Sequence, residues 1–386
     1  MEVVNKVKLS DIAELITKGT TPTTLGFNFQ PSGVNFLKIE CFDDNGSYLK
    51  DKVAHISEEC NDKLKRSQLK QGDILFSIAG AIGRVAIVTD EMLPANTNQA
   101  LAIIRISNED IYLPYIKLIL TSPIIRKQFE RKKQGVAQLN LSLKDIGDLE
   151  IPLVSREKQI EMLNTFDKVV DIITARKQQL TKLDELVKSR FVELFGHKRY
   201  PENTLLNLCN IIDYRGKTPE KVEYGLPFIT AKNVKMHQMN LEPREYISKE
   251  TYDKVMIRGF PKEGDVVFTT EAPLGNVCRI PHFDTEFYIG QRIVTMQTEK
   301  LEPIYLEYAL SSDDFRMKYM EKSSGSTVTG IRVRLLEQLT IPVPPMELQN
   351  QFATFVEQVD KSKIAVQKAL DEAQTLFDSL MQEYFG

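Results

Sequence analysis

The chain has 386 residues, of which 42% are hydrophobic and 27% are charged, a balance typical of a soluble globular protein. Its net charge of −3 argues against a nucleic-acid binder whose whole surface is basic. No run of about 18 apolar residues is present, which excludes a membrane-spanning helix. The first residues lack the basic and apolar regions of a signal peptide, so we expect a cytoplasmic protein with no membrane partner.

Residues 1–154 predict a block of strands and short helices. Apolar runs predict strands in VNFLKI (34–39) and GDILFSI (72–78), and YLPYIKLILTS (112–122) has the period of a helix. An Ile-Pro motif, LEIPLVSREKQ (149–159), closes the block. Because proline disfavours helix in the residue before it and suits the first turn of a helix, a helix is predicted to begin just after this motif.

A long helix is predicted for residues 155–196. Between Arg156 and Phe195 there is neither proline nor glycine, and apolar residues recur every seven positions, which is the pattern of a coiled coil about 60 Å long. The repeated positions are Phe166, Ile173, Leu180, Val187 and Leu194, with Leu163, Val170 and Phe191 on the alternate seam. Two polar residues also fall on the seam, Lys177 and Asp184. They either form a solvated face or fix the register between two helices.

The second half of the chain repeats the first. GDVVFTTEAPLGNVCR begins at Gly264, which is 192 positions after the matching Gly72. The motif KGTTP (18–22) returns as RGKTP (215–219), and the Ile-Pro motif returns as LTIPVPPMELQ (339–349). Self-similarity at a fixed offset indicates a tandem duplication.

A second heptad run follows the second Ile-Pro motif. Its apolar positions are Phe352, Val359, Val366, Ala373 and Leu380. Neither helix can bury its apolar stripe alone, so we expect the two to pack against each other. The sequence therefore predicts an α+β fold in which two mixed domains alternate with two long helices. The expected boundaries are 1–154, 155–196, 197–344 and 345–386.

The glycines of GDILFSIAGAIGRVAI (72–87) raise the possibility of a phosphate-binding loop, which the surrounding residues exclude. The Lys-Ser or Lys-Thr pair of a Walker A loop is absent after Gly83 and Gly275, and there is no Gly-x-Gly-x-x-Gly fingerprint. A nuclease cluster of carboxylates and lysine is not found in a convincing setting. The tetrapeptide of a base-amino methyltransferase and the Gly-x-Ser-x-Gly elbow are both absent from the sequence. The sequence offers no catalytic site.

A zinc site is also disfavoured. The cysteines form no Cys-x-x-Cys pair, and the chain has only four histidines. We expect free, mostly buried thiols in a reducing compartment at Cys41, Cys60, Cys209 and Cys278.

The duplicated order of motifs resembles the specificity subunit of type I restriction–modification systems. The features that carry the resemblance are the Gly-x-Thr-Pro turns, the paired GDILFS and GDVVFT strands, the Ile-Pro turns before Gln159 and Gln349, and the helix ends FVELFG and MQEYFG. It covers the whole chain, and its specificity lies in the order of short motifs rather than in any one of them.

The resemblance implies a non-catalytic subunit that binds double-stranded DNA. Each mixed block would be a target recognition domain that reads one half of a bipartite, asymmetric site. The helices would form an antiparallel spacer that docks two methyltransferase (M) subunits. AdoMet, ATP and Mg are expected only in partner subunits, among them the restriction and translocase (R) subunits, and none in this chain. Half-sites about one helical turn apart, roughly 34 Å, are the geometric default for two domains on one side of a duplex.

Polar residues in the matched loops are the candidates for DNA contact, because their side chains suit base edges and phosphates. Arg332 and Arg334 alternate in a strand-like run. Each candidate is otherwise a solvated loop or cap residue. The candidates are Thr20, Thr21, Asn96, Asn98, Gln99, Lys132, Lys133, Gln138 and Asn140 in the first half, and Arg215, Lys217, Thr218, Gln291, Arg292, Lys322, Ser326, Thr327, Thr329, Arg332 and Arg334 in the second.

Two other functions remain open at this point. A coiled-coil adaptor whose mixed domains bind protein predicts no salt-sensitive affinity for DNA. An autonomous methyltransferase–nuclease predicts AdoMet binding by this chain alone, which the missing motifs oppose.

Overall fold

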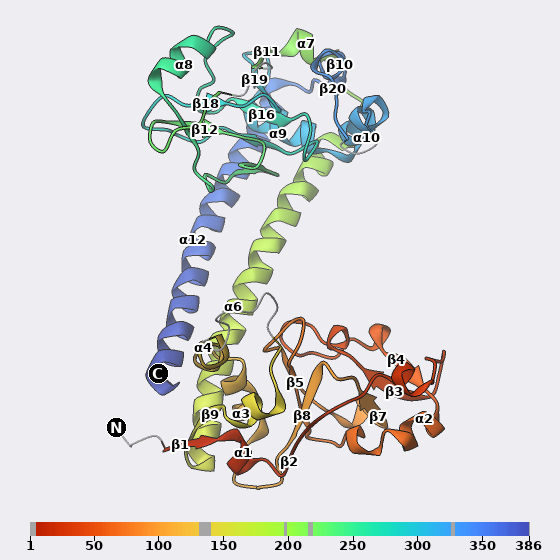
Figure 1. Ribbon diagram of the computed structural model, residues 1–386. Coiled ribbons are helices and arrows are strands. Elements are labelled where there is room, and N and C mark those ends of the chain that lie inside the picture. Colours follow the sequence, from red (N-terminus) through yellow and green to blue (C-terminus); the bar gives the residue numbers. More distant parts are fainter. Residues whose placement is uncertain (1–4, 131–139, 197–198, 215–218, 326–328, 386) are drawn as a thin grey trace. The chain divides into compact units, whose positions relative to one another are not determined.

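The structure is a computed structural model that describes residues 5–130, 140–196, 199–214, 219–325 and 329–385. The chain forms two compact units. The first unit comprises residues 1–177 and 368–386, and the second comprises residues 178–367 (Figure 1). The four boundaries expected from the sequence stay a prediction.

The first unit holds most of the first repeat. Its strands are β1 (Asn5–Lys8), β2 (Leu15–Lys18), β3 (Val34–Leu37), β4 (Ala54–Ile56), β5 (Ile74–Ser77), β6 (Val85–Ile87), β7 (Ala95–Thr97), β8 (Leu101–Arg105) and β9 (Glu150–Leu153). Its helices are α1 (Leu9–Ile12), α2 (Glu58–Lys63), α3 (Leu113–Leu120), α4 (Pro123–Glu130), α5 (Leu143–Gly147) and the first part of α6 (Arg156–Phe191). The strands β3 and β5 and the helix α3 confirm the predicted elements.

The second unit repeats this order, with the hairpin β13–β14 added. Its strands are β10 (Glu202–Thr204), β11 (Asn210–Asp213), β12 (Leu226–Ile229), β13 (Val234–Lys235), β14 (Gln238–Met239), β15 (Tyr246–Ile247), β16 (Val266–Thr269), β17 (Val277–Arg279), β18 (Tyr288–Ile289), β19 (Ile293–Gln297) and β20 (Thr340–Pro342). Its helices are α7 (Leu205–Leu208), α8 (Lys249–Val255), α9 (Pro303–Ser311), α10 (Asp313–Lys322), α11 (Val333–Leu336) and the first part of α12 (Met346–Phe385).

The two units share a sheet topology. Strand order is β2-β8-β5-β6 in the first unit and β11-β19-β16-β17 in the second, and both sheets are antiparallel. A smaller sheet, β4-β3-β7 or β15-β12-β18, contains one parallel pair in each unit. The register also repeats, because Ile74 lies opposite Ile104 as Val266 lies opposite Met296. The duplication read from the sequence is therefore a duplication of structure.

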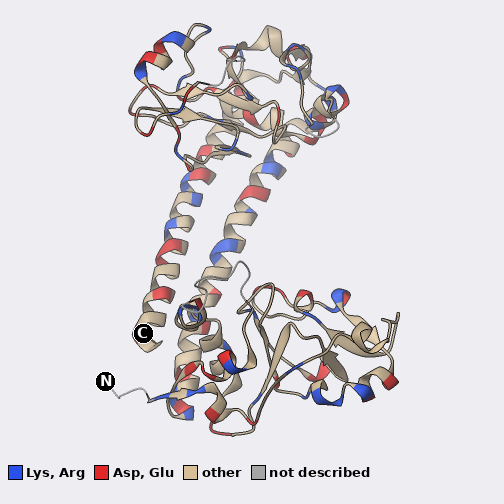
Figure 2. Cartoon of the chain, in the orientation of Figure 1, with Lys and Arg blue, Asp and Glu red and all other residues tan. Residues whose placement is uncertain are grey.

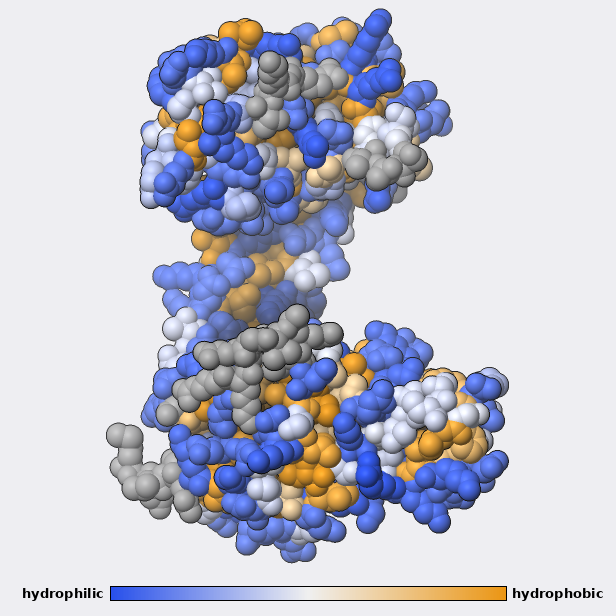
Figure 3. Space-filling view, in the orientation of Figure 1, coloured by the Kyte–Doolittle hydropathy of each residue, from blue (hydrophilic) through white to orange (hydrophobic). Residues whose placement is uncertain are grey.

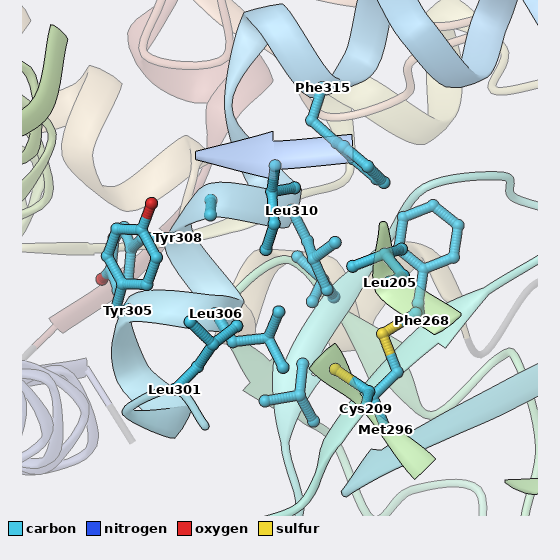
Figure 4. Packing of buried hydrophobic residues seen from close by; sticks show 14 of the residues in the cluster. Leu205, Cys209, Phe268, Met296, Leu301, Tyr305, Leu306, Tyr308, Leu310 and Phe315 are labelled. Carbon is cyan, nitrogen blue, oxygen red and sulfur yellow. The ribbon is translucent and has the colours of Figure 1, made fainter. Parts of the chain in front are cut away.

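The core of the second unit lies between its antiparallel sheet and α9. Helix α9 is buried from Ile304 to Leu310, and its apolar residues belong to the hydrophobic core of the unit. Figure 4 shows Phe268 of β16 and Met296 of β19 in the same cluster as Leu306 of α9. One charged side chain, Glu307, lies in this buried stretch.

The long helices begin where the Ile-Pro motifs predict, at Arg156 and Met346. In the first unit the start of α6 packs on the end of α12, where the ring of Phe166 lies 5.4 Å from that of Phe377. In the second unit the end of α6 packs on the start of α12, where the ring of Phe191 lies 5.4 Å from that of Phe352. The helices are therefore antiparallel.

The heptad positions are largely confirmed. All ten residues of the two main runs are buried or half-buried. The prediction that Val170 lies on the alternate apolar seam is wrong. Val170 is 42% exposed, because its neighbour Val169 takes the buried position. Asp184 forms an ion pair with Lys363 of α12 at 2.6 Å, which supports its interpretation as a register residue, and Lys177 is exposed.

A buried glutamine ties each long helix to its own unit. The Oε1 atom of Gln349 accepts from the backbone N–H of Glu302 at 3.0 Å, and its Nε2 donates to the carbonyl of Pro344 at 2.8 Å. Gln159 makes the equivalent bonds with Tyr112 and Val154, both at 2.8 Å. The glutamine that follows each Ile-Pro motif is thus a structural clamp.

Replacing Gln349 by alanine is expected to lower the free energy of unfolding by about 2 kcal/mol, because two backbone groups lose their partner in a buried place. Urea denaturation followed by circular dichroism measures the change. Asn350→Ala, at the exposed neighbouring position, is the control. Equal stability of the two variants would contradict the clamp.

All four cysteines are buried free thiols, which confirms that prediction. Burial raises the pKa of the Cys209 and Cys278 thiols to about 12, so both stay protonated at neutral pH. Among the described residues, His, Cys, Asp and Glu nowhere gather in a group of three or more suited to a metal ion. The described helices also lack an apolar stretch long enough to cross a membrane.

Candidate nucleic-acid interface

Part of the predicted contact set lies outside the described residues. These positions are Lys132, Lys133, Gln138, Arg215, Lys217, Thr218, Ser326 and Thr327. The remaining candidates divide between the two units.

In the first unit, Asn96 is wrongly placed among the candidates. Its side chain is 0% exposed. Its Oδ1 accepts from the hydroxyl of Ser67 at 2.7 Å, and its Nδ2 donates to Oδ1 of Asn61 at 3.0 Å and to the carbonyl of Leu64 at 3.2 Å. A buried amide with its hydrogen bonds satisfied braces the loop and cannot reach a base edge.

Two other candidates of the first unit, Thr21 and Gln99, are distant in the sequence and in contact in the structure. The hydroxyl of Thr21 donates to Oε1 of Gln99, so the Gly-Thr-Thr-Pro turn and the loop after β7 lie together. Asn98 accepts from the N–H of Ala100 at 3.1 Å, which makes it a turn residue. Thr20 is half-buried and Asn140 is exposed.

In the second unit, candidates from separate loops line one groove. We call this the second-unit groove. It has a volume of about 250 Å³ and is lined by Thr270, Glu271, Gln291, Ser324, Gly330, Ile331, Arg332 and Val333. Gln291 and Arg332 are both sequence-predicted candidates, and they reach the groove from two separate loops, one before β19 and one before α11.

The backbone of the groove is held by main-chain hydrogen bonds. The N–H of Ile331 donates to the carbonyl of Thr270 at 3.0 Å, and Ser324 and Gly330 exchange bonds at 2.9 and 3.1 Å. A Cβ atom at Gly330 would lie 3.1 Å from the Cβ of Glu271. Glycine at this position therefore allows the two segments to approach closely.

Charged side chains surround this backbone. Nε of Arg292 lies 3.1 Å from Oε1 of Glu271, and both side chains are about half-exposed. Nζ of Lys322 lies 3.5 Å from Oε1 of Glu321. Thr329 is exposed. Figure 2 shows basic and acidic residues mixed over the drawn face of this unit, so neither sign dominates there.

The prediction of a strand at Arg332 and Arg334 is wrong. Arg332 is the N-cap of the short helix α11, and Arg334 lies within that helix. Both side chains are exposed while Val333 between them is buried, so the alternation is real but belongs to a helix start. A single turn of helix is too short to show a helical period.

The individual candidates do not include Glu271, Thr270 and Ser324, although their segments TTEAPL (269–274) and KSSGSTVTG (322–330) stand out in the sequence. A lone polar residue in a loop carries no motif. The divergence of the repeat is the signal that was available, because Glu271 stands where the first copy has Ala79.

The glycine turns keep their conformation in both copies. Gly83 and Gly275 have φ angles of 88° and 92°. Gly80 has a φ of 72°, and Ala272 at the matching position has a φ of 48°, so alanine occupies a left-handed conformation beside the groove. This conformation costs a residue with a Cβ roughly 1 kcal/mol, and the second copy retains it.

Comparison with known proteins places this geometry among related chains. The family model for the type I restriction modification DNA specificity domain matches residues 1–184 and 202–373. The type I restriction enzyme MjaVIII specificity subunit of Methanocaldococcus jannaschii is 23% identical over 85% of this chain and 83% of its own length. The type I restriction enzyme EcoBI specificity subunit of Escherichia coli is 30% identical over 42% of this chain and 35% of its own length.

A solved structure has the same fold. It was determined in work on complex assembly and conformational transition of the type I R-M system, and its chain is 19% identical. The match covers 99% of this chain and 97% of the other, with a TM-score of 0.65. Two β-rich domains and two long packed helices are thus an architecture found in a related assembly.

Proposed function

The chain belongs to the family of type I restriction–modification DNA specificity proteins, and from this premise we propose that its two repeats read the two halves of a bipartite DNA site. Specificity subunits are the non-catalytic members of type I restriction–modification complexes. The proposal concerns which DNA is read and by which part of the chain.

The observation that carries the proposal is a duplicated frame with different side chains at its loops. The hydrogen bond from Leu141 to Ile78 in the first unit repeats as the bond from Ile331 to Thr270 in the second, both at 3.0 Å. The groove side chains on this frame differ between the copies. Two readers built alike but lined differently suit an asymmetric site in which each half has its own sequence.

The family suggests the partners. Two methyltransferase subunits and the restriction subunits would assemble on this chain in the cytoplasm, and AdoMet, ATP and Mg would belong to those partners. A modest electrostatic contribution from this chain, whose net charge is −3, fits an assembly in which partner subunits supply much of the phosphate binding.

The long helices expose apolar residues that a partner is proposed to cover. Ile364 of α12 is 71% exposed, and Leu186 and Val192 at the end of the first long helical stretch are about half-exposed. Figure 3 shows hydrophobic residues among hydrophilic ones on the drawn face of the helical segment. Single exposed apolar residues are common on protein surfaces, so the proposal that a partner covers these positions rests on the family.

Replacing Ile364 by alanine is expected to weaken binding of the methyltransferase subunit about thirtyfold, which corresponds to burial of most of one isoleucine side chain, about 2 kcal/mol. Titration calorimetry of the two purified proteins measures the change. Gln358→Ala, an exposed polar position on the same helix, is expected to bind normally. Unchanged affinity of the Ile364 variant would place the docking surface elsewhere.

Mapping of methylated adenines tests the proposed function. The chain is co-expressed with an adenine methyltransferase subunit of the same system, and modified positions are read across a genome. A bipartite motif with two different halves is the expected result. Methylation without a bipartite motif, or DNA binding that ignores salt, would favour the adaptor alternative.

A further inference from the structure

Arg332 is presented to the second-unit groove by a rigid support. Its flanking residues Ile331 and Val333 are buried in the core of the unit. The backbone at Arg332 is extended and caps α11, and the N–H of Ile331 is bonded to Thr270. A side chain that leaves such an anchored backbone is well placed for a specific contact.

The charges around the groove leave the guanidinium of Arg332 available to bind a ligand. Glu271 is engaged by Arg292 at 3.1 Å. Among the described residues, no carboxylate lies within 4.0 Å of Arg332. Arg332 is therefore an exposed cation on a fixed backbone in the described lining of the groove, which also includes Gln291.

The first unit lacks this chemistry at the same places. Ser142 stands at the position of Arg332, and it also caps its helix, with its hydroxyl accepting from the N–H of Asp145 at 3.1 Å. Ala79 replaces Glu271 and Ala100 replaces Arg292. The backbone frame is common to both copies, so these side chains are where the copies differ in what they can recognise.

Among the four bases, guanine is the best partner for an arginine with an anchored backbone and no carboxylate partner. Guanine offers O6 and N7 as two acceptors in the major groove, and arginine donates to both in a fixed fork. Phosphate is the other anionic partner on DNA, and a phosphate contact carries no sequence information.

We propose that Arg332 is a specificity-determining residue of the second unit and that it reads a guanine in one half of the target site. This inference rests on the proposed function. It adds the residue, the base and the half-site to the general statement that the chain recognises DNA.

The test compares the methylation motifs of complexes that carry the wild-type chain or Arg332→Ala. The variant is expected to relax one guanine position in one half of the motif and to leave the other half unchanged. Binding to a duplex with the wild-type motif is expected to fall about tenfold to a hundredfold. Arg316→Ala, which alters an exposed arginine of α10 in the same unit and outside the groove, is the matched control and should retain the motif.

Other outcomes overturn the inference. An unchanged motif in Arg332→Ala would exclude a base contact. Uniformly weaker binding to all sequences, with a smaller salt dependence, would identify a phosphate contact instead. If the wild-type complex itself gave no bipartite motif, the proposed function would fail and the inference with it. Urea denaturation confirms that each variant is folded.

Discussion

Replacing Glu307 by alanine is expected to lower the free energy of unfolding of the second unit by about 3 kcal/mol. Glu307 is 2% exposed. Its Oε1 lies 2.8 Å from Nδ1 of His237, and its Oε2 accepts from Nε of Arg279 at 2.7 Å. Removing the carboxylate leaves a partly buried guanidinium without its main partner, and this loss of compensation sets the size of the effect.

The surroundings of Arg279 limit the loss. Burial alone would lower the pKa of Arg279, and the carboxylates of Glu307 and Asp360 outweigh it and raise that pKa. Asp360 of α12 lies 3.5 Å from its Nη2 and would remain in the variant. The side chain is also about one third exposed, so water compensates part of the lost interaction.

Urea denaturation measures the change, and hydrogen exchange of peptides from residues 178–367 assigns it to the second unit. Glu307→Gln, which keeps the shape and one acceptor, is expected to lose less than the alanine variant. Glu357→Ala, at an exposed position, is the control and should change the stability by less than about 0.5 kcal/mol. A Glu307→Ala chain as stable as this control would contradict the account.

Replacing Phe166 by alanine is expected to destabilise the first unit by about 3–5 kcal/mol. The ring is 0% exposed. It lies 5.4 Å from the ring of Phe377, 5.7 Å from that of Phe385 and 6.1 Å from that of Tyr384. Because these rings belong to the end of α12, the cavity left by the variant would open at the contact between the two helices.

Val170→Ala is the informative comparison. The heptad pattern places Val170 on the apolar seam, whereas the structure leaves it 42% exposed and buries Val169. A loss below about 0.5 kcal/mol for Val170→Ala, beside about 1–2 kcal/mol or more for Val169→Ala, is the expected result. The reverse order would show that the helices pair along the seam read from the sequence.

The architecture was predictable because the sequence contains a tandem duplication. The motifs at Gly72 and Gly264 and the Ile-Pro turns recur in fixed order, so each weak local signal is repeated. Helix starts at Arg156 and Met346 followed from proline chemistry. The sequence alone did not decide which of Val169 and Val170 is buried, because two adjacent valines fit the apolar seam of the helix equally well.

The candidate site was less predictable. Gln291 and Arg332 were named because they are polar and lie in matched loops, and the fold brings them to one groove. Asn96 satisfied the same criterion and is buried, since a loop asparagine can bond to its own backbone surroundings as readily as to a ligand. Residue type and loop position do not report burial, which depends on tertiary packing.

The central claim is that each repeat reads its own half of the target. It is tested most directly by exchanging residues 1–154 for the matching segment of a related specificity subunit that directs methylation to a different bipartite motif. Methylation mapping of the chimera with its methyltransferase subunit is expected to show one new half-site, taken from the donor, and one retained half-site. A motif that stays entirely unchanged, or one that changes in both halves, would contradict the account.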